Sequence, residues 1–225
     1  MNPARTLEAR QLMVDSQLRP NEVNDDRIID AVMAVPRELF VPKARRSAAY
    51  IDEDLPLGGG RYVMEPMIFA RLLVAADIKD KDCVLDIGSA TGYSSAVLSH
   101  LAESVVSVEA DADMAHAAEK TFSELELHNI AALTGDMAIQ GDMKETVSKQ
   151  GPFDVIILQG AVDGGVEEIA QHLADGGRLV CVKVKNAVGR AHIITRRGDV
   201  FAGHDLFDAH IPYLPGFEQA ASFEF

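Results

Sequence analysis

From residue 83 onward, short apolar runs alternate with segments of helical periodicity, and this alternation constrains the fold more than any other feature of the chain. Candidate strands are the apolar or β-branched runs 83–87, 104–108, 130–133, 153–158 and 178–184. Candidate helices between them cover 94–101, 111–125 and 165–173. Apolar strands that alternate with helices form a mostly parallel sheet with helices on both faces. The pattern therefore predicts a doubly wound α/β domain.

Two later apolar runs predict antiparallel strands at the C-terminal end of this otherwise parallel sheet. Residues 191–196 and 200–207 flank the tripeptide Arg197-Gly198-Asp199, which is a turn signal between two strands. Such a connection is too short for a helical crossover, so the two strands pair in antiparallel fashion. We thus expect seven strands, with an antiparallel hairpin at the C-terminal end of the sheet.

The first eighty residues lack the alternation and are predicted to be helices and turns. One helix is expected over 5–17 and a second over 25–34, with Asn24 as its N-cap. A third begins at Pro66, which suits the first helical turn, and follows the turn Gly58-Gly59-Gly60. We expect residues 1–80 to form a helical N-terminal extension packed on a main domain of residues 81–225.

Composition and charge exclude several classes of function. The 225 residues include 21 Lys plus Arg against 35 Asp plus Glu, a formal net charge of −14 that argues against nucleic-acid and anionic-membrane partners. No apolar run approaches the roughly 20 residues of a membrane span, and the polar N-terminus does not match a signal peptide. Cys83 and Cys181 lie in apolar runs and are expected to be buried thiols. We predict a cytoplasmic protein.

Two common kinds of catalytic site are also absent from the sequence. The seven histidines show no H-E-x-x-H motif and no paired Cys/His spacing, so no metal site is predicted. The G-x-S-x-G turn of serine hydrolases does not occur either. Phe217, Phe223 and Phe225 near the C-terminus are expected to pack in the core or against an edge strand.

A glycine-bearing turn follows the first strand of the α/β region and marks the expected ligand site. In doubly wound sheets, ligands bind at the carboxyl ends of the strands. The turn Gly88-Ser89-Ala90-Thr91-Gly92 fails the dinucleotide fingerprint, because that motif needs glycines at its first, third and sixth positions. Asp86 at the strand end would repel a pyrophosphate but would favour a cation. S-adenosylmethionine is a cationic, phosphate-free ligand of this kind, with a sulfonium and an ammonium group.

Two further acids end the next two strands. Glu109 stands 23 residues after Asp86, where a carboxylate can accept hydrogen bonds from both ribose hydroxyls of an adenosine. Asp136, in the sequence Gly135-Asp136-Met137, stands where an adenine amino group can donate. Asp86, Glu109 and Asp136 at three successive strand ends form one constellation with the glycine turn, and together they favour an adenosyl ligand.

These residues resemble the class I S-adenosylmethionine-dependent methyltransferases, which have a Rossmann-like sheet, and within that class the protein-L-isoaspartate O-methyltransferases. The resemblance runs from about Met13 to about Val184. Its broad part is the segment 84–93, and its more specific part lies upstream, at 35–42 and 49–57. The segments 135–141, 152–156 and 173–180 are similar to later motifs of the family. It implies that S-adenosylmethionine is the cofactor, with S-adenosylhomocysteine as product, and that the substrate is a polypeptide with isoaspartyl residues. By carry-over, the cofactor-binding residues are Asp86, Gly88, Ser89, Gly92, Glu109 and Asp136.

The chain departs from the family at the stretch that holds the reacting serine. The family has Thr-Ile-Ser-Gln-Pro, whereas this chain has Tyr62-Val63-Met64-Glu65-Pro66, which places Met64 at the serine position. The family's glycine is also replaced at Ala90. Glu65 would repel a substrate carboxylate, which Lys183 or Lys185 could bind instead. No catalytic residue is therefore assigned, although a carboxylate acceptor with a pKa near ~4 is ionised at neutral pH and needs no general base.

Three functions remain open on these grounds. The first is methylation of the isoaspartyl carboxylate in damaged proteins, as the resemblance implies. The second is methyl transfer to another substrate, which the substitutions at Met64 and Glu65 favour. The third is a non-catalytic module that keeps the cofactor pocket as a sensor or scaffold.

Overall fold

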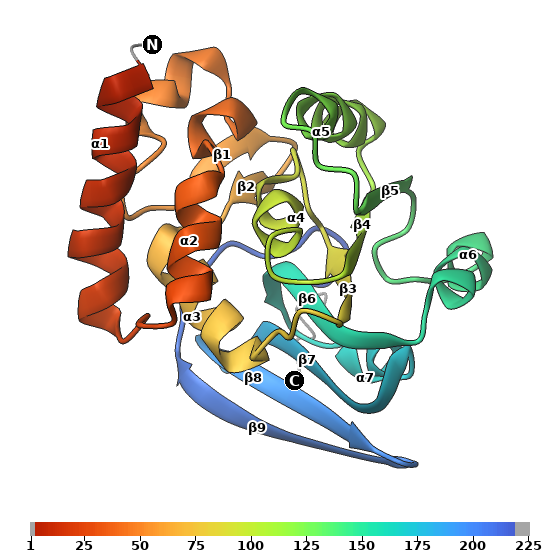
Figure 1. Cartoon of the computed structure of the whole chain (residues 1–225). Coiled ribbons are helices and arrows are strands. Elements are labelled where there is room, and N and C mark those ends of the chain that lie inside the picture. The colour runs from red at the N-terminus through yellow and green to blue at the C-terminus, as the bar shows by residue number, and fades with distance from the viewer. Residues whose placement is uncertain (1–2, 219–225) are drawn as a thin grey trace, which may run out of the picture.

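The computed structural model describes residues 3–218, and its main feature is a seven-stranded sheet in the order β5-β4-β3-β6-β7-β8-β9 (Figure 1). The strands are β3 (Cys83–Ile87), β4 (Ser104–Glu109), β5 (Ile130–Thr134), β6 (Phe153–Val162), β7 (Leu173–Lys185), β8 (Val188–Arg197) and β9 (Val200–Asp208). Strands β3 to β7 pair in parallel, and β8 and β9 are antiparallel to their neighbours. The predicted doubly wound sheet with its C-terminal hairpin is confirmed.

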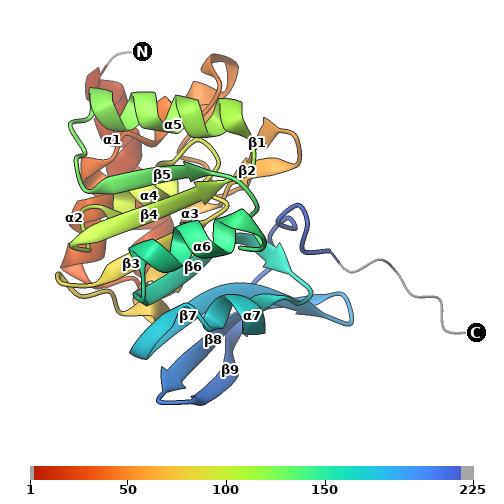
Figure 2. The ribbon, with the colours of Figure 1, turned by 90° about the vertical axis from the view of Figure 1, so that its right-hand side faces the viewer.

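Helices cover both faces of the sheet (Figure 2). The helices are α1 (Pro3–Met13), α2 (Asp26–Ala34), α3 (Pro66–Ala76), α4 (Tyr93–Leu98), α5 (Ala112–Glu124), α6 (Asp142–Gln150) and α7 (Val166–Ala170). Shorter helical turns are η1 (Val14–Leu18), η2 (Arg19–Asn21), η3 (Arg37–Phe40) and η4 (Lys43–Ala48). Helices α3 and α4 contact the sheet, whereas α1 and α2 pack outside them and α6 and α7 lie on the opposite face.

Alternate residues of each central strand enter different cores. Val84 and Val155 face the core shared with α1 to α5, whereas Leu85 and Ile156 face the core shared with α6 and α7. Strands that are apolar on both faces are typical of parallel sheets covered by helices. The first core also contains Met13, Leu18 and other residues from the first eighty. The N-terminal part of the chain therefore packs into the same core as this face of the sheet.

The elements differ from the sequence-based expectations mainly at their ends. Helix α2 is capped by Asp25, whose side chain accepts a hydrogen bond from the Arg27 N–H, and the prediction of Asn24 as N-cap was wrong by one residue. Helix α6 was not predicted, because its sequence is mostly polar and Val147 is its one buried residue. Helix α7 is shorter than expected and β6 and β7 are longer, since pairing with neighbouring strands extends them.

Two segments reach the carboxyl edge of the parallel strands from distant parts of the sequence. The first is a hairpin of β1 (Leu55–Gly58) and β2 (Arg61–Val63), whose turn contains Gly58, Gly59 and Gly60, all with positive φ. The second, residues 209–217, which we call the C-terminal strap, runs back from β9 to the middle of the sheet (Figure 1). The strap is fixed to β6 by Ala161, which donates to the Pro212 carbonyl and accepts from the Leu214 N–H, both at 2.8 Å.

Among residues 3–218, no helix is long and apolar enough to cross a membrane. Cys83 is partly buried and Cys181 is buried, and both are free thiols. Phe217 is buried against the second core, as expected, whereas Phe223 and Phe225 lie outside the described residues.

Candidate functional site

The glycine turn between β3 and α4 is shaped by three residues with positive φ. Gly88, Ala90 and Gly92 have φ values of +77°, +51° and +92°. Ala90 thus adopts the left-handed conformation that glycine adopts most easily, at the position where the family usually has glycine. At Gly92, a Cβ atom would lie within 2.8 Å of atoms of Phe122 and Ala118, so its lack of a side chain lets α5 pack against the turn.

Asp86 lies beneath this turn and is fully buried. Its Oδ2 accepts hydrogen bonds from the hydroxyls of Ser94 and Ser95 at 2.6 and 2.5 Å, and its Oδ1 accepts one from the Gln159 amide at 2.8 Å. Burial raises the pKa of Asp86, while these three bonds and the Arg61 charge act in the opposite direction. A cation placed nearby would favour the ionised carboxylate further.

Glu109 ends β4 directly beside the glycine turn and is also buried. Its Oε1 accepts from the backbone N–H groups of Ala110 and Asp111 at 2.9 and 3.1 Å. Its Oε2 accepts from the Ala90 N–H at 2.7 Å and from Arg61. The chain thus positions this carboxylate with backbone donors from two loops, which fixes its orientation toward the turn.

Arg61 was not predicted as a site residue, yet its guanidinium occupies the centre of this site. Its Nη2 and Nε donate to Glu109 Oε2 at 2.9 and 3.2 Å, and Nη2 also donates to the Gly88 carbonyl. The Arg61 side chain is 5% exposed and that of Glu109 is 2% exposed. Arg61 lies 48 positions from Glu109 in the sequence, and the sole signal was a cation directly after the triple glycine.

Leu214 of the C-terminal strap closes the same region from the other side. A Cβ atom at Gly88 would clash with the Leu214 side chain and lie 2.9 Å from Arg61 Nη2. A Cβ atom at Gly160 would lie 2.9 to 3.0 Å from Leu214. Both glycines therefore bring their backbones against Leu214, which is fully buried.

The remaining predicted cofactor residues lie around this centre. Ser89 is buried, and its hydroxyl accepts a hydrogen bond from Ser107 at 2.7 Å. Asp136 follows β5 and is exposed, with its Oδ1 accepting from the Ala138 N–H. The Gly135 N–H donates to the Glu109 carbonyl at 3.0 Å, so Asp136 begins its loop next to the end of β4. The predicted residues are thus distributed along one edge of the sheet.

Met64 lies across a small cavity from the glycine turn and is 7% exposed. Arg37, which is fully buried, holds its backbone by donating from Nη2 to the Met64 carbonyl and from Nε to the Ala49 carbonyl, both at 2.7 Å. The Arg37 guanidinium also stacks 4.7 Å from the Tyr93 ring centroid. The space between Met64 and Gly88 is a cavity of about 10 Å³, room for about one water molecule.

Carboxyl groups gather beside Met64. Asp54 Oδ1 accepts from the Glu65 N–H at 2.9 Å. Burial raises the pKa of Glu65 to about 7, with further contributions from the charges of Asp54 and Asp52. Burial raises the pKa of Asp54 as well, although its bond to Glu65 and the Arg37 charge lower it. An acceptor that approaches Met64 therefore meets acidic neighbours.

Lys183 and Lys185 line a groove of about 650 Å³ at the carboxyl end of β7. Lys183 donates to Glu167 of α7 at 3.0 Å, so its charge is already paired. Asp163 and Asp205 also line the groove, which is therefore of mixed charge. Within the described range, no three His, Cys, Asp or Glu side chains are grouped so that they could hold a metal ion.

Comparisons with known sequences support the resemblance seen in the motifs. The family model "Protein-L-isoaspartate(D-aspartate) O-methyltransferase (PCMT)" matches residues 8–213. A protein-L-isoaspartate O-methyltransferase of Koribacter versatilis is 38% identical over 171 residues, 76% of this chain and 74% of that protein. A second relative, protein-L-isoaspartate O-methyltransferase 2 of Shewanella sediminis, is 35% identical over 86% of this chain and 77% of its own length.

Solved structures share the fold. One protein-L-isoaspartate O-methyltransferase superposes with a TM-score of 0.76 at 23% identity, covering 94% of this chain and 66% of that one. A Plasmodium falciparum β-aspartate methyltransferase, solved in complex with S-adenosyl-L-homocysteine, superposes with a TM-score of 0.77 at 18% identity and covers 91% of this chain and 97% of that one.

Proposed function

Because the chain belongs to the protein-L-isoaspartate(D-aspartate) O-methyltransferase family, we propose that it transfers a methyl group from S-adenosylmethionine to the carboxylate of isoaspartyl residues in polypeptides. The observation that carries this proposal is the family match over residues 8–213, which includes both the glycine turn and the acids beside it. The two free cysteines agree with a cytoplasmic location, where thiols stay reduced.

The acidic side chains at the carboxyl edge suit this cofactor. Glu109 offers a carboxylate for ribose hydroxyls, Asp136 an exposed acceptor for an adenine amino group, and Asp86 a negative charge for the cationic end. Gly88 has no side chain, so its backbone can be approached closely, here by Leu214 and Arg61. When bound, S-adenosylmethionine supplies a methyl group that its sulfonium has already activated. Room for it must come from movement of Arg61 and Leu214, which fill the centre of the edge.

Residues 81–225 bind the cofactor in this proposal, and residues 1–80 build the acceptor side. Arg37 holds the Met64 backbone in place, and Met64 and Phe69 form an apolar wall beside the glycine turn. Such a wall keeps water out and helps to line up the attacking oxygen with the methyl carbon, and this alignment lowers the barrier of a direct displacement. The acceptor carboxylate is already ionised at neutral pH, so none of these residues needs to remove a proton.

The test is transfer of a labelled methyl group from S-adenosylmethionine to an isoaspartyl peptide, with the aspartyl isomer of the same peptide as control. We expect incorporation into the isoaspartyl form alone. Glu109→Gln serves as the matched variant, because it keeps the size of the side chain and removes its charge. If saturating cofactor gives no incorporation into the isoaspartyl peptide, the proposed activity is wrong.

A second acceptor class is favoured by the carboxyl groups beside Met64. Glu65 and Asp54 repel an incoming carboxylate when they are ionised, and they attract an amine. Transfer to an amine-bearing peptide but not to the isoaspartyl peptide would identify this alternative. The double variant Met64→Ser, Glu65→Gln restores the family residues at both positions, and under the isoaspartyl proposal it raises kcat/KM for the isoaspartyl peptide by about tenfold.

A further inference from the structure

The hydrogen bonds of Glu109 leave no acceptor position free for another ligand. Oε2 accepts from Arg61 Nε, Arg61 Nη2 and the Ala90 N–H, while Oε1 accepts from the N–H groups of Ala110 and Asp111. A carboxylate offers about four lone-pair sites. Two ribose hydroxyls can therefore bind here only when a present donor leaves, and Arg61 is the one side chain among these donors.

Backbone donors are the less mobile part of this arrangement. The N–H of Ala90 belongs to the glycine turn, and those of Ala110 and Asp111 belong to the connection between β4 and α5. They keep Glu109 oriented and partly compensate its charge when Arg61 moves away, so its buried carboxylate is never left without partners.

Arg61, by contrast, directly follows a turn of three glycines. The three preceding residues are Gly58, Gly59 and Gly60, all with positive φ, and a Cβ atom added at Gly58 or Gly59 would meet no atom within 4 Å. Glycine has the greatest backbone freedom of all residues, so the tip of the β1–β2 hairpin can change conformation and carry Arg61 with it.

We propose that Arg61 is a built-in competitor for the cofactor's ribose site, so that cofactor binding exchanges the guanidinium for the two ribose hydroxyls on Glu109. This inference rests on the proposed function, because it takes Glu109 as the ribose acceptor. It goes beyond that function in assigning Arg61 the role of setting cofactor affinity. Leu214, against Gly88 from the strap side, must shift in the same step.

The first test compares S-adenosylhomocysteine binding to the full-length protein and to Arg61→Met by isothermal titration calorimetry. Each charged hydrogen bond that the cofactor no longer has to break is worth about a tenfold change in affinity, so we expect Arg61→Met to bind at least about tenfold more tightly. Arg61→Lys keeps the charge but lacks the planar fork, and its affinity should fall between the two.

Arg27→Met is the matched control. It removes the same charge at the opposite edge of the sheet, where Arg27 donates to the carbonyls of Ile78 and Leu101 ahead of β3 and β4. Its affinity for S-adenosylhomocysteine should equal that of the wild type, which shows that a tighter Arg61→Met complex does not come from net charge.

The second test follows the guanidinium itself by NMR in the wild-type protein, so it does not depend on whether Arg61→Met folds. The Arg61 resonance is identified as the Nε–H signal that is present in the wild-type spectrum and absent from that of Arg61→Lys. We expect its hydrogen exchange with water to rise at least about tenfold on saturation with S-adenosylhomocysteine, because burial and hydrogen bonding to Glu109 both end.

The outcomes separate this inference from the function on which it rests. Equal affinities of wild type and Arg61→Met, or an Arg61 Nε–H that stays protected in the complex, overturn the competitor role and leave the methyltransferase proposal standing. A failure of the wild type and every Arg61 variant to bind S-adenosylhomocysteine overturns both.

Discussion

Two arginine–carboxylate pairs with little solvent exposure occupy opposite edges of the same sheet. At the amino edge, Arg178 pairs with Asp82 at 2.6 Å and also donates to the carbonyls of Ala76, Asp77 and Asp154. At the carboxyl edge, Arg61 pairs with Glu109 at 2.9 Å and also donates to the Gly88 carbonyl. Both are ion pairs between a guanidinium and a carboxylate. Because their surroundings differ, we expect one to affect the stability of the fold and the other to affect ligand binding.

The difference lies in what else could bind to each pair. The partners of Arg178 end α3 and begin β3 and β6, so the pair joins three elements at an edge where doubly wound sheets do not bind ligands. The partners of Arg61 are the groups that an adenosyl ligand would use. A buried ion pair therefore stabilises the fold at one edge and competes for a ligand at the other, and its position in the topology decides which.

The largest expected effect is on the amino-edge pair. Arg178→Met leaves Asp82 buried without its cation and removes the donor to three carbonyls, and loss of one partner of a buried pair costs about 4 kcal/mol. Urea unfolding should show this loss in the free energy of unfolding, while S-adenosylhomocysteine affinity below the transition stays unchanged. A loss of affinity at unchanged stability would show that the Arg178–Asp82 pair acts on ligand binding rather than on the fold.

The next effect is the corresponding change at the carboxyl edge. Glu109→Gln removes the charge that strengthens two hydrogen bonds to ribose, and we expect S-adenosylhomocysteine to bind about 100-fold more weakly. Asp82→Asn is the matched control and should leave the dissociation constant as it is. Calorimetric titration of both variants checks this, and equal losses would mean that the two edges do not differ.

A smaller effect is expected on the acceptor side, where Glu65 makes the stability of the protein depend on pH. The pKa of Glu65 is raised to about 7, chiefly by burial and then by Asp54 and Asp52, against an ordinary value of 4.5. The folded protein thus holds this proton more tightly than the unfolded chain does. Its stabilising contribution is fully present below about pH 4.5 and is lost as the pH rises through about 7.

Glu65→Gln removes that pH dependence. With allowance for partial exposure, we expect the variant to be more stable than wild type by about 1 kcal/mol at pH 8 and equal to it near pH 4.5. Thermal unfolding over this range measures the difference. Glu53→Gln, at an exposed position in the loop ahead of β1, is the control, and a gain that does not vary with pH would contradict the assignment.

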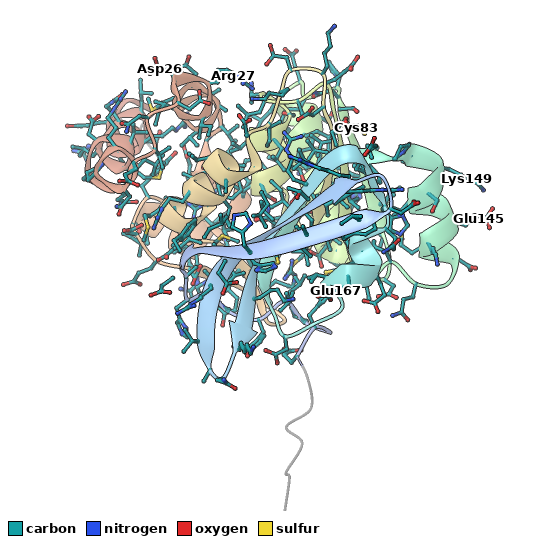
Figure 3. The ribbon with its side chains drawn as sticks, turned by 90° about the horizontal axis from the view of Figure 1, so that it is seen from below. Asp26, Arg27, Cys83, Glu145, Lys149 and Glu167 are labelled. Carbon is teal, nitrogen blue, oxygen red and sulfur yellow. The ribbon has the colours of Figure 1, made fainter. Side chains whose placement is uncertain are left out.

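The smallest effect concerns an ion pair away from both edges. Glu145 and Lys149 lie on the outer side of α6 (Figure 3) and approach to 2.7 Å, with both side chains mostly exposed. Exposed pairs at this spacing are worth about 0.3–0.5 kcal/mol, so Glu145→Ala should change the free energy of unfolding by no more than this. A loss above 1 kcal/mol in urea unfolding would show that exposure does not separate this pair from the buried ones.

The order and type of most elements could be predicted because their signals are local. Strand β3 begins and ends where expected, and Pro66 begins α3, since apolar runs and proline geometry act within a few residues. Helix α6 was missed because it presents so little apolar surface to the sheet. Element ends shifted where long-range pairing added residues, as in the extension of β6 beyond residue 158.

The parallel sheet, the glycine turn and the acids at three successive strand ends could all be predicted from local sequence. Each of these depends on the spacing of residues along one short segment, and parallel strands bring their carboxyl ends to one edge whatever the rest of the chain does. Which side chains contact those acids depends instead on the folding of the whole chain. Arg61 and Leu214 reach the turn from 27 residues before Gly88 and from the far end of the chain, and no local pattern encodes a contact between segments so far apart.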